Sequence, residues 1–106
     1  MNTHFKKGAL ELCVLSLLAK GDMYGYELTD RISREMSIAG GTLYPILKKL
    51  REERYVTTYL MESDSGPARK YYRLSDEGRA REAVLRAEWT AFADAVRRLL
   101  DSPLPA

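Results

Sequence analysis

The segment from Gly40 to Leu50 constrains the fold more than any other part of this 106-residue chain. Its apolar residues recur at i, i+3, i+4 and i+7, the spacing of one face of an α-helix. They are Leu43, Ile46, Leu47 and Leu50. Two glycines precede Thr42, and we expect Pro45 in the first turn, where its missing N–H and fixed φ are tolerated. The segment therefore predicts a short helix that buries one leucine-rich face.

The opposite side of this predicted helix is polar and basic. At about 100° per residue it carries Gly41, Tyr44, Pro45, Lys48 and Lys49. Two lysines and a tyrosine near the start of a helix suit contact with the major groove of DNA. The alternative is an ordinary amphipathic helix whose lysines only mark a solvated face.

A second helix is expected just before it, from about residue 24 to residue 36. Its apolar stripe consists of Leu28, Ile32 and Met36. Two short helices joined by a tight turn that contains glycine form a helix-turn-helix. Tyr24 and Tyr26 lie at the start of this helix, where backbone N–H groups and a phenol can hold a phosphate. One of the two tyrosines is expected in the core, and the sequence leaves open which.

Residues 55–61 and 69–74 are expected to form a β-hairpin, since both are rich in β-branched and aromatic side chains and a turn cluster at 63–67 separates them. A two-stranded hairpin is marginal alone and must pack against helices. Arg69 and Lys70 open the second strand, and because side chains alternate along a strand, at most one is expected to point at a groove. The layout is that of a winged helix-turn-helix, whose wing can reach phosphates.

The two ends of the chain are predicted to be helical and to need a second subunit. Residues 8–19 are apolar over most of a helical circumference, so a partner is expected to supply part of their cover. Ser75 is a predicted N-cap for one long helix over residues 76–100. Its apolar residues step by four and three, as in a heptad-like seam. They are Leu85, Trp89, Phe92, Val96 and Leu99.

The predicted fold class is therefore mainly α with a β-hairpin, a winged helix-turn-helix plus one long C-terminal helix. The predicted organisation is a DNA-binding domain over 1–74, a homodimerisation helix over 75–102 and a tail over 103–106. Charge follows this division. Residues 1–75 hold twelve basic and nine acidic side chains, whereas residues 76–106 hold five and six. The positive excess thus belongs to the part with the candidate DNA-reading helix.

The sequence argues against an enzyme, a cofactor or a metal site. Cys13, the only cysteine, is expected to pack as a small apolar residue, and His4, the only histidine, is expected in an N-terminal tail. No nucleophile–base pair and no phosphate loop is evident. The absence of a signal peptide and of an apolar run long enough to span a bilayer favours a cytoplasmic protein without a membrane partner.

Several short motifs, in their order and spacing, resemble the PadR family of transcriptional regulators, in its short subtype with a single C-terminal helix. The resemblance covers roughly residues 8–100. It rests on Leu15–Leu18, Tyr24-Gly25-Tyr26-Glu27-Leu28, Gly41-Thr42-Leu43-Tyr44-Pro45 with Leu47 and Leu50, Arg69-Lys70-Tyr71-Tyr72, and Leu74-Ser75 with Gly78. It implies a dimeric winged helix that binds inverted repeats in promoters, usually as a repressor. In some members phenolic acids or planar cationic drugs release the DNA.

One position departs from the family pattern. Members usually carry glycine and then an aliphatic residue after the third helix, whereas this chain has Arg54 and Tyr55. A glycine there would end the helix in a left-handed conformation. Arginine in that role costs on the order of 1 kcal/mol. The exit from the third helix is therefore a place where this chain can differ from the family.

The predicted contacts to double-stranded promoter DNA draw on all these elements. Thr42 and Tyr44 are expected at phosphates or base edges, with Lys48 one turn further on and Lys49 at most on a phosphate. The alternatives are helix capping for Thr42 and local packing for Tyr44. The full candidate set is Tyr24, Tyr26, Thr42, Tyr44, Lys48, Lys49, Arg69 and Lys70. A protein–protein adaptor without DNA reading is the competing function, and the near-neutral total charge is its best support.

Trp89 is the candidate for ligand chemistry. A tryptophan in a dimer seam is usually a packing anchor. The alternative is the wall of a pocket between subunits, where two symmetry-related indoles hold a planar aromatic effector or attract a cation. Phe92 would line the same cavity. Glu88 and Asp94 are candidates to bind a cationic ligand, or else are solvated.

Overall fold

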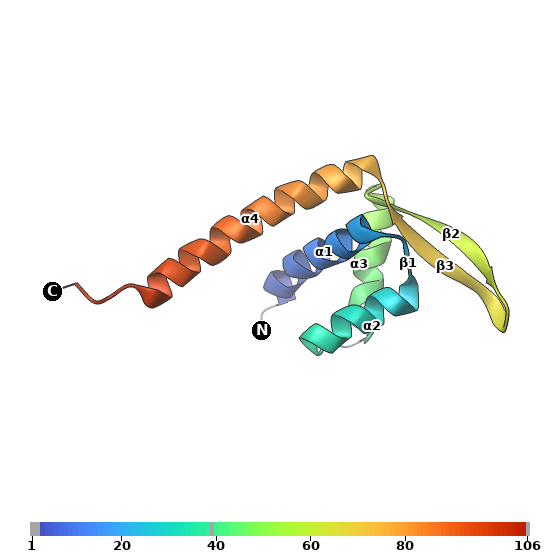
Figure 1. Cartoon of the computed structure of the whole chain (residues 1–106), viewed down its shortest axis with the longest axis horizontal. Coiled ribbons are helices and arrows are strands. Elements are labelled where there is room, and N and C mark those ends of the chain that lie inside the picture. The colour runs from blue at the N-terminus through green and yellow to red at the C-terminus, as the bar shows by residue number, and fades with distance from the viewer. Residues whose placement is uncertain (1–2, 39, 106) are drawn as a thin grey trace.

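The computed structural model describes residues 3–38 and 40–105, with side chains from residue 8 onward except that of residue 40. The chain forms a small body from which one long helix projects, so that the molecule measures 67 × 28 × 21 Å (Figure 1). The elements, in chain order, are α1 (Thr3–Lys20), β1 (Met23–Tyr24), α2 (Gly25–Met36), α3 (Gly40–Glu52), β2 (Val56–Ser63), β3 (Gly66–Leu74) and α4 (Asp76–Asp101). This order confirms the predicted winged helix-turn-helix with a long C-terminal helix.

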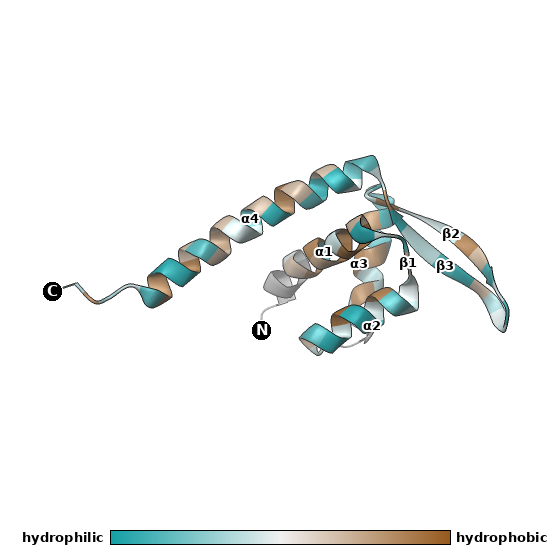
Figure 2. Ribbon diagram, in the orientation of Figure 1, coloured by the Kyte–Doolittle hydropathy of each residue, from teal (hydrophilic) through white to brown (hydrophobic). Residues whose placement is uncertain are grey.

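Helix α1 lies at the centre of the body and contacts α2, α3, α4 and β3. Its stripe Leu10, Val14, Leu15 and Leu18 is almost completely buried. The predicted stripe of α3 completes the core together with Leu28, Ile32, Val56, Tyr72 and Leu74. Figure 2 shows apolar residues in both α1 and α3, and the two helices contact one another. The chain itself therefore covers much of the apolar circumference of α1, and Leu12 is left half-buried on the side of α4.

The sheet has three strands where the sequence analysis expected a two-stranded hairpin. Its order is β1-β3-β2, with both pairs antiparallel. The added strand is only two residues long, and it pairs Met23 with Tyr72 and Tyr24 with Tyr71. So short a strand carries no alternation for a sequence pattern to detect. It ties the base of the wing to the start of α2.

Two local predictions were wrong. Helix α3 begins at Gly40, so Pro45 lies in the second turn and not the first, and the ring removes the hydrogen bond that an N–H there would donate to the Gly41 carbonyl. Helix α1 begins at Thr3, so the backbone of His4 is helical and not part of a tail, while its side chain lies outside the described residues. In both cases the helix extends further towards its N-terminus than the apolar pattern indicates.

The exit from α3 keeps the left-handed turn that a glycine would favour. Arg54 adopts φ 65°, and the Tyr55 N–H donates to the Leu50 carbonyl oxygen at 2.9 Å, which closes the helix end. The departure at this position therefore changes the energy of the turn and not its path. At the other side of the turn, Ser75 caps α4 by accepting a hydrogen bond from the Gly78 N–H at 3.0 Å, as predicted.

Candidate nucleic-acid interface

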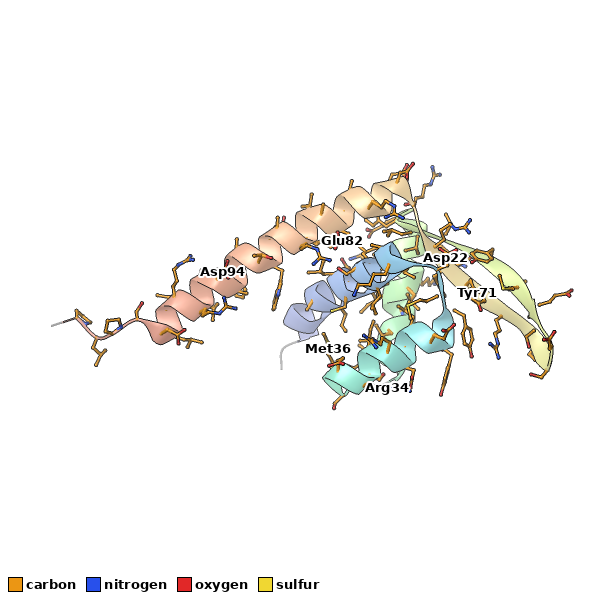
Figure 3. All side chains as sticks on the ribbon, viewed as in Figure 1. Asp22, Arg34, Met36, Tyr71, Glu82 and Asp94 are labelled. Carbon is orange, nitrogen blue, oxygen red and sulfur yellow. The ribbon has the colours of Figure 1, made fainter. Side chains whose placement is uncertain are left out.

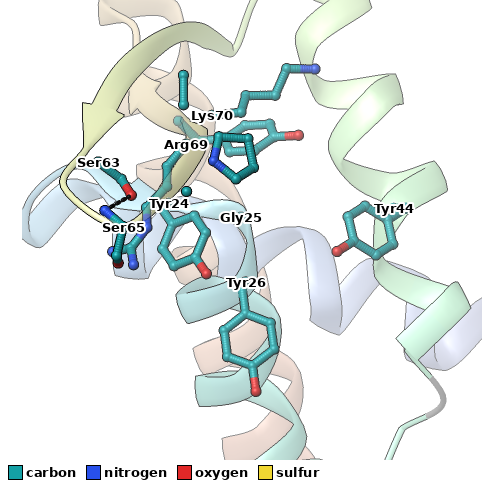
Figure 4. Close-up of a pocket in the computed structure, with 12 residues that line it drawn as sticks. Tyr24, Gly25, Tyr26, Tyr44, Ser63, Ser65, Arg69 and Lys70 are labelled. Carbon is teal, nitrogen blue, oxygen red and sulfur yellow. Dashed lines mark hydrogen bonds between the residues drawn. The ribbon is translucent and has the colours of Figure 1, made fainter.

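A cleft of about 420 Å³ lies between the start of α2, helix α3 and the wing (Figure 4). It collects residues that are far apart in the sequence. Its lining is Tyr24, Gly25, Tyr26, Tyr44, Ser63, Ser65, Gly66, Pro67, Ala68, Arg69, Lys70 and Tyr72. Five of the eight predicted DNA-contact residues are among them. Five small residues of the wing tip also line the cleft and were not singled out, because they carry no charge. They are Ser63, Ser65, Gly66, Pro67 and Ala68.

The start of α2 presents one tyrosine outwards and packs the other against the wing. Tyr26 is 64% exposed. Tyr24 is half-buried, with its ring 6.0 Å from that of Tyr71 and the Arg69 guanidinium carbon 4.9 Å from its centroid. Neither tyrosine belongs to the buried core, although one of them was expected there, and both line the cleft. Tyr26 offers an exposed phenol at the helix N-terminus, while Tyr24 fixes the wing.

Helix α3 exposes Tyr44 and Lys48 on the same side. Tyr44 is 52% exposed and lines the cleft, and Lys48 is exposed one turn further on, with its ammonium 3.9 Å from Glu52. An ion pair at that distance between exposed groups holds the lysine only weakly. Its charge therefore stays available to a phosphate.

Arg51 belongs to this face and was missed by the sequence analysis. It lies three residues after Lys48 and seven after Tyr44, so it shares their side of the helix, and it is exposed. Burial raises the pKa of the Tyr72 hydroxyl, and the positive charge of Arg51 opposes that rise, which indicates that the two groups are close. The signal was available in the sequence as helical spacing, but Arg51 follows the last leucine of the apolar stripe.

Thr42 and Lys49 lie away from the cleft. Both line a separate hollow against α1, together with Glu11, Pro45 and Ile46. The Lys49 ammonium lies 2.8 Å from the Glu11 carboxylate, and this hydrogen bond raises the pKa of Lys49. The structure thus places Lys49 in an ion pair between α1 and α3, and it places both Lys49 and Thr42 outside the cleft that the other candidates line. Tertiary contacts of this kind are invisible to a helical wheel.

Arg69 and Lys70 both line the cleft, although strand alternation predicted that at most one would do so. Arg69 reaches it by stacking on Tyr24, while Lys70 lies on the opposite side of β3 and is exposed. The wing thus brings two cations to the same cleft as Tyr44. This is an arrangement for contacting a phosphate backbone.

The outer face of the sheet carries a separate cluster of aromatic and charged side chains. Tyr59 stacks on Tyr71 with ring centroids 5.5 Å apart, and the Arg73 guanidinium lies over the Tyr59 ring. Tyr71 and the nearby Asp22 are labelled in Figure 3. Asp22 accepts hydrogen bonds from the Tyr59 hydroxyl at 2.7 Å and from Arg73 at 3.0 Å. The bond from Tyr59 is the main cause that lowers the pKa of Asp22. Arg73 is thus engaged within the wing and is set apart from the cations of the cleft.

The predicted seam of α4 is exposed over most of its length in the single chain. Leu85 packs against the core, but Trp89 is 42% exposed, Phe92 53% and Leu99 80%. Trp89 and Phe92 have ring centroids 6.3 Å apart. With Gly8, Ala9, Leu12, Leu85 and Glu88 they line an apolar hollow of about 260 Å³ between α1 and α4.

The remaining candidates for chemistry are few. Among the side chains described, no group of three His, Cys, Asp or Glu residues is placed to hold a metal ion. Cys13 is half-buried against the core, and burial raises the pKa of its thiol. No helix within 3–38 or 40–105 is long and apolar enough to cross a membrane.

The chain is similar to known regulators in sequence and in structure. Residues 14–83 match the model of the transcriptional regulator PadR-like family. A Streptococcus transcriptional regulator superposes with a TM-score of 0.85 at 33% identity, over 94% of this chain and 100% of that one. A PadR-like transcriptional regulator from Bacillus cereus superposes with a TM-score of 0.82 at 30% identity, over 92% and 96%. The negative transcriptional regulator PadR of Bacillus subtilis is 32% identical over 66% of this chain and 41% of its own length.

Proposed function

The chain belongs to the PadR-like family of transcriptional regulators, and we propose that it is a dimeric repressor that binds an inverted-repeat operator in promoter DNA. Membership of a family of non-enzymatic regulators confirms the expectation that it is not an enzyme. In the proposal residues 1–74 bind DNA, residues 75–102 form the dimer and residues 103–106 are a tail. A protein of this function works in the cytoplasm.

The observation that carries DNA binding is the cleft between α2, α3 and the wing. It unites a phenol on α2, a phenol on α3 and two wing cations, namely Tyr26, Tyr44, Arg69 and Lys70. Lys48 and Arg51 continue the same side of α3 beyond it. We propose that α3 enters the major groove with Tyr44 at base edges and Lys48 on a phosphate, while the wing and the start of α2 contact the flanking phosphates. The salt bridge of Lys49 removes that residue from the proposed contacts.

The dimer is supported by the apolar seam of α4. Trp89, Phe92, Val96 and Leu99 share one helical face and are between 37% and 80% exposed in the single chain. A contiguous apolar stripe of this kind on a projecting helix is typical of a subunit interface. A second copy, packed antiparallel or crossed along α4, would cover it and would present two α3 helices to the DNA.

Repression is proposed from a relative. The Bacillus subtilis protein that shares 32% identity with this chain is a negative transcriptional regulator. A dimer that is bound at a promoter can block transcription by occupying the site. Repression therefore requires nothing beyond affinity for that DNA. The competing adaptor function does not need cations on both elements that flank the cleft.

The decisive experiment is binding of the full chain to labelled DNA from upstream of its own gene, followed by fluorescence anisotropy at several salt concentrations. We expect specific binding whose affinity falls steeply with salt, since each phosphate contact contributes to the slope. Competition with unrelated DNA of the same length separates specific binding from general attraction. An adaptor would bind both DNAs equally weakly, and that result would overturn the proposal.

An effector is proposed for the hollow beside Trp89. Its 260 Å³ in one chain would join the symmetry-related hollow in a dimer, giving a slot between two indoles with Glu88 at its edge. Planar aromatic compounds, cationic ones included, have the matching shape and charge. Such a ligand releases DNA only to the extent that it prefers a dimer whose α3 helices no longer match the operator.

A further inference from the structure

Helix α4 is attached to the body at two separate places. The first is its start, where Gly78 lies directly against the Tyr55 carbonyl. A Cβ on Gly78 would come within 2.0 Å of that oxygen. The Ser75 hydroxyl lies 2.9 Å from the same oxygen and accepts from the Gly78 N–H. This contact fixes a point through which α4 must pass, but one point does not set the direction of a helix.

The second attachment lies one to two turns later, on α1. Glu82 accepts hydrogen bonds from the Ser16 hydroxyl at 2.9 Å and from the Arg86 Nε at 2.8 Å, and Arg86 Nη2 donates to Ser16 at 3.2 Å. The three side chains form a closed cluster, with Glu82 between α4 and α1 (Figure 3). The Glu82 side chain is only 13% exposed. Burial opposes its ionisation, but the hydrogen bonds from Ser16 and Arg86 outweigh this and lower the pKa of Glu82.

Two attachments on one helix set its direction, and the length of α4 magnifies any change. Twenty-six residues span about 39 Å, so a tilt of about 10° moves the far end by about 7 Å. In the proposed dimer the far part of α4 pairs with its copy. The direction of α4 relative to the body therefore determines how far apart the two α3 helices lie. That separation must match one turn of DNA, about 34–36 Å, for both half-sites to be occupied.

We infer that the Ser16–Glu82–Arg86 cluster is the joint that sets which half-site spacing the regulator accepts, with Glu82 as its central positioning residue. The inference rests on the proposed dimeric DNA-binding function. None of the three residues lines the DNA cleft, and Glu82 and Arg86 lie on the flank of α4 beside the seam and not within it. In this proposal the cluster affects only the direction of α4 relative to the body, and it contacts neither the DNA nor the second subunit.

The test compares the parent with Glu82→Gln and Ser16→Ala on operators whose two half-sites are separated by spacers of varied length. We expect both variants to remain dimers and to bind a single half-site like the parent. Their discrimination between the best spacer and one that is two base pairs longer should fall by about three- to tenfold, the range that the net contribution of one ordinary hydrogen bond allows. Glu77→Gln removes an exposed carboxylate from the same helix and is the matched control.

A second measurement does not depend on DNA. Spin labels on Arg31→Cys in α2 and Arg98→Cys in α4, in a Cys13→Ala background and diluted with unlabelled chain, report the direction of α4 within one protomer. We expect Glu82→Gln to broaden or shift the distance distribution, and Glu77→Gln to leave it unchanged. An unchanged distance distribution in Glu82→Gln would show that the cluster does not set the direction of α4. A changed distribution with an unchanged spacing preference overturns its role in operator choice. If the parent binds no DNA, the proposed function fails, and the distances alone decide whether the cluster orients α4.

Discussion

Helices α1 and α4 both carry long apolar stripes, yet one is buried and the other is not. Leu15 of α1 is fully buried, whereas Phe92 of α4 is 53% exposed and Leu99 is 80% exposed. The difference lies in their place along the chain. Helix α1 is surrounded by the elements that follow it, while α4 comes last and extends past the body (Figure 1). Periodicity identifies a stripe in either case, but the topology decides whether the same chain or a second one covers it.

The largest effect is expected from charges in the exposed stripe. Phe92→Asp together with Val96→Asp would bury two carboxylates from each subunit in the proposed seam, at a cost on the order of 4 kcal/mol or more in dimer stability. We expect folded monomers by light scattering and circular dichroism, because the body has its own core. Arg97→Asp tests the same charge on another side of α4 and should remain dimeric. A double variant that stays a stable dimer would show that the exposed stripe of α4 does not form the subunit interface.

The buried stripe should respond differently. Leu15→Ala removes a fully buried side chain, and we expect a decrease of about 3 kcal/mol in the free energy of unfolding. Because this side chain packs within one chain, the difference from the parent should hardly change with protein concentration in thermal or urea denaturation. Leu99→Ala, on the exposed stripe, is the matched control and should show its effect mainly at low concentration. A concentration-dependent decrease in Leu15→Ala would place α1 in the subunit interface after all.

The sequence predicted the order of the helices and the hairpin, the buried stripe of α3 and the cap at Ser75, since each depends on neighbours a few residues apart. The predicted stripe of α2 was right for Leu28 and Ile32 but wrong for Met36, which is 41% exposed. The short strand Met23–Tyr24 was not predicted, because its pairing with Tyr71 and Tyr72 involves residues nearly fifty positions away. The same limit applies to the site. Tyr44 was located correctly on an exposed face of α3 from spacing alone, whereas the ion pair of Lys49 with Glu11 depends on how α1 packs against α3.

A third prediction separates DNA contact from dimer contact. Lys48→Ala and Arg51→Ala change exposed side chains on α3, so both should leave the dimer and its stability unchanged. Each should weaken operator binding by about five- to tenfold and flatten the salt slope by roughly one unit, because one phosphate fewer is neutralised. Lys49→Ala is the control, because its ammonium pairs with Glu11. Anisotropy at three salt concentrations gives both quantities. If Lys49→Ala has the strongest effect of the three, the orientation of α3 on DNA differs from the one proposed.

The smallest effect is expected at Arg54, which lies in the body close to the start of the projecting helix α4. Its φ of 65° strains any residue with a Cβ, and its carbonyl oxygen lies 2.6 Å from the Ser75 hydroxyl that caps α4. Arg54→Gly relieves the strain but gives the unfolded chain more freedom, so the net gain in the free energy of unfolding should be only about 0.5 kcal/mol. For a domain of this size that is a rise of roughly 2–4 °C in Tm. Arg54→Ala removes the same side chain and keeps the Cβ, so it should give no such rise. The difference between the two variants therefore measures the backbone strain separately from the loss of the guanidinium group. A Gly variant no more stable than the Ala variant would mean that the turn carries no strain, and that this chain can replace the family's glycine at no energetic cost.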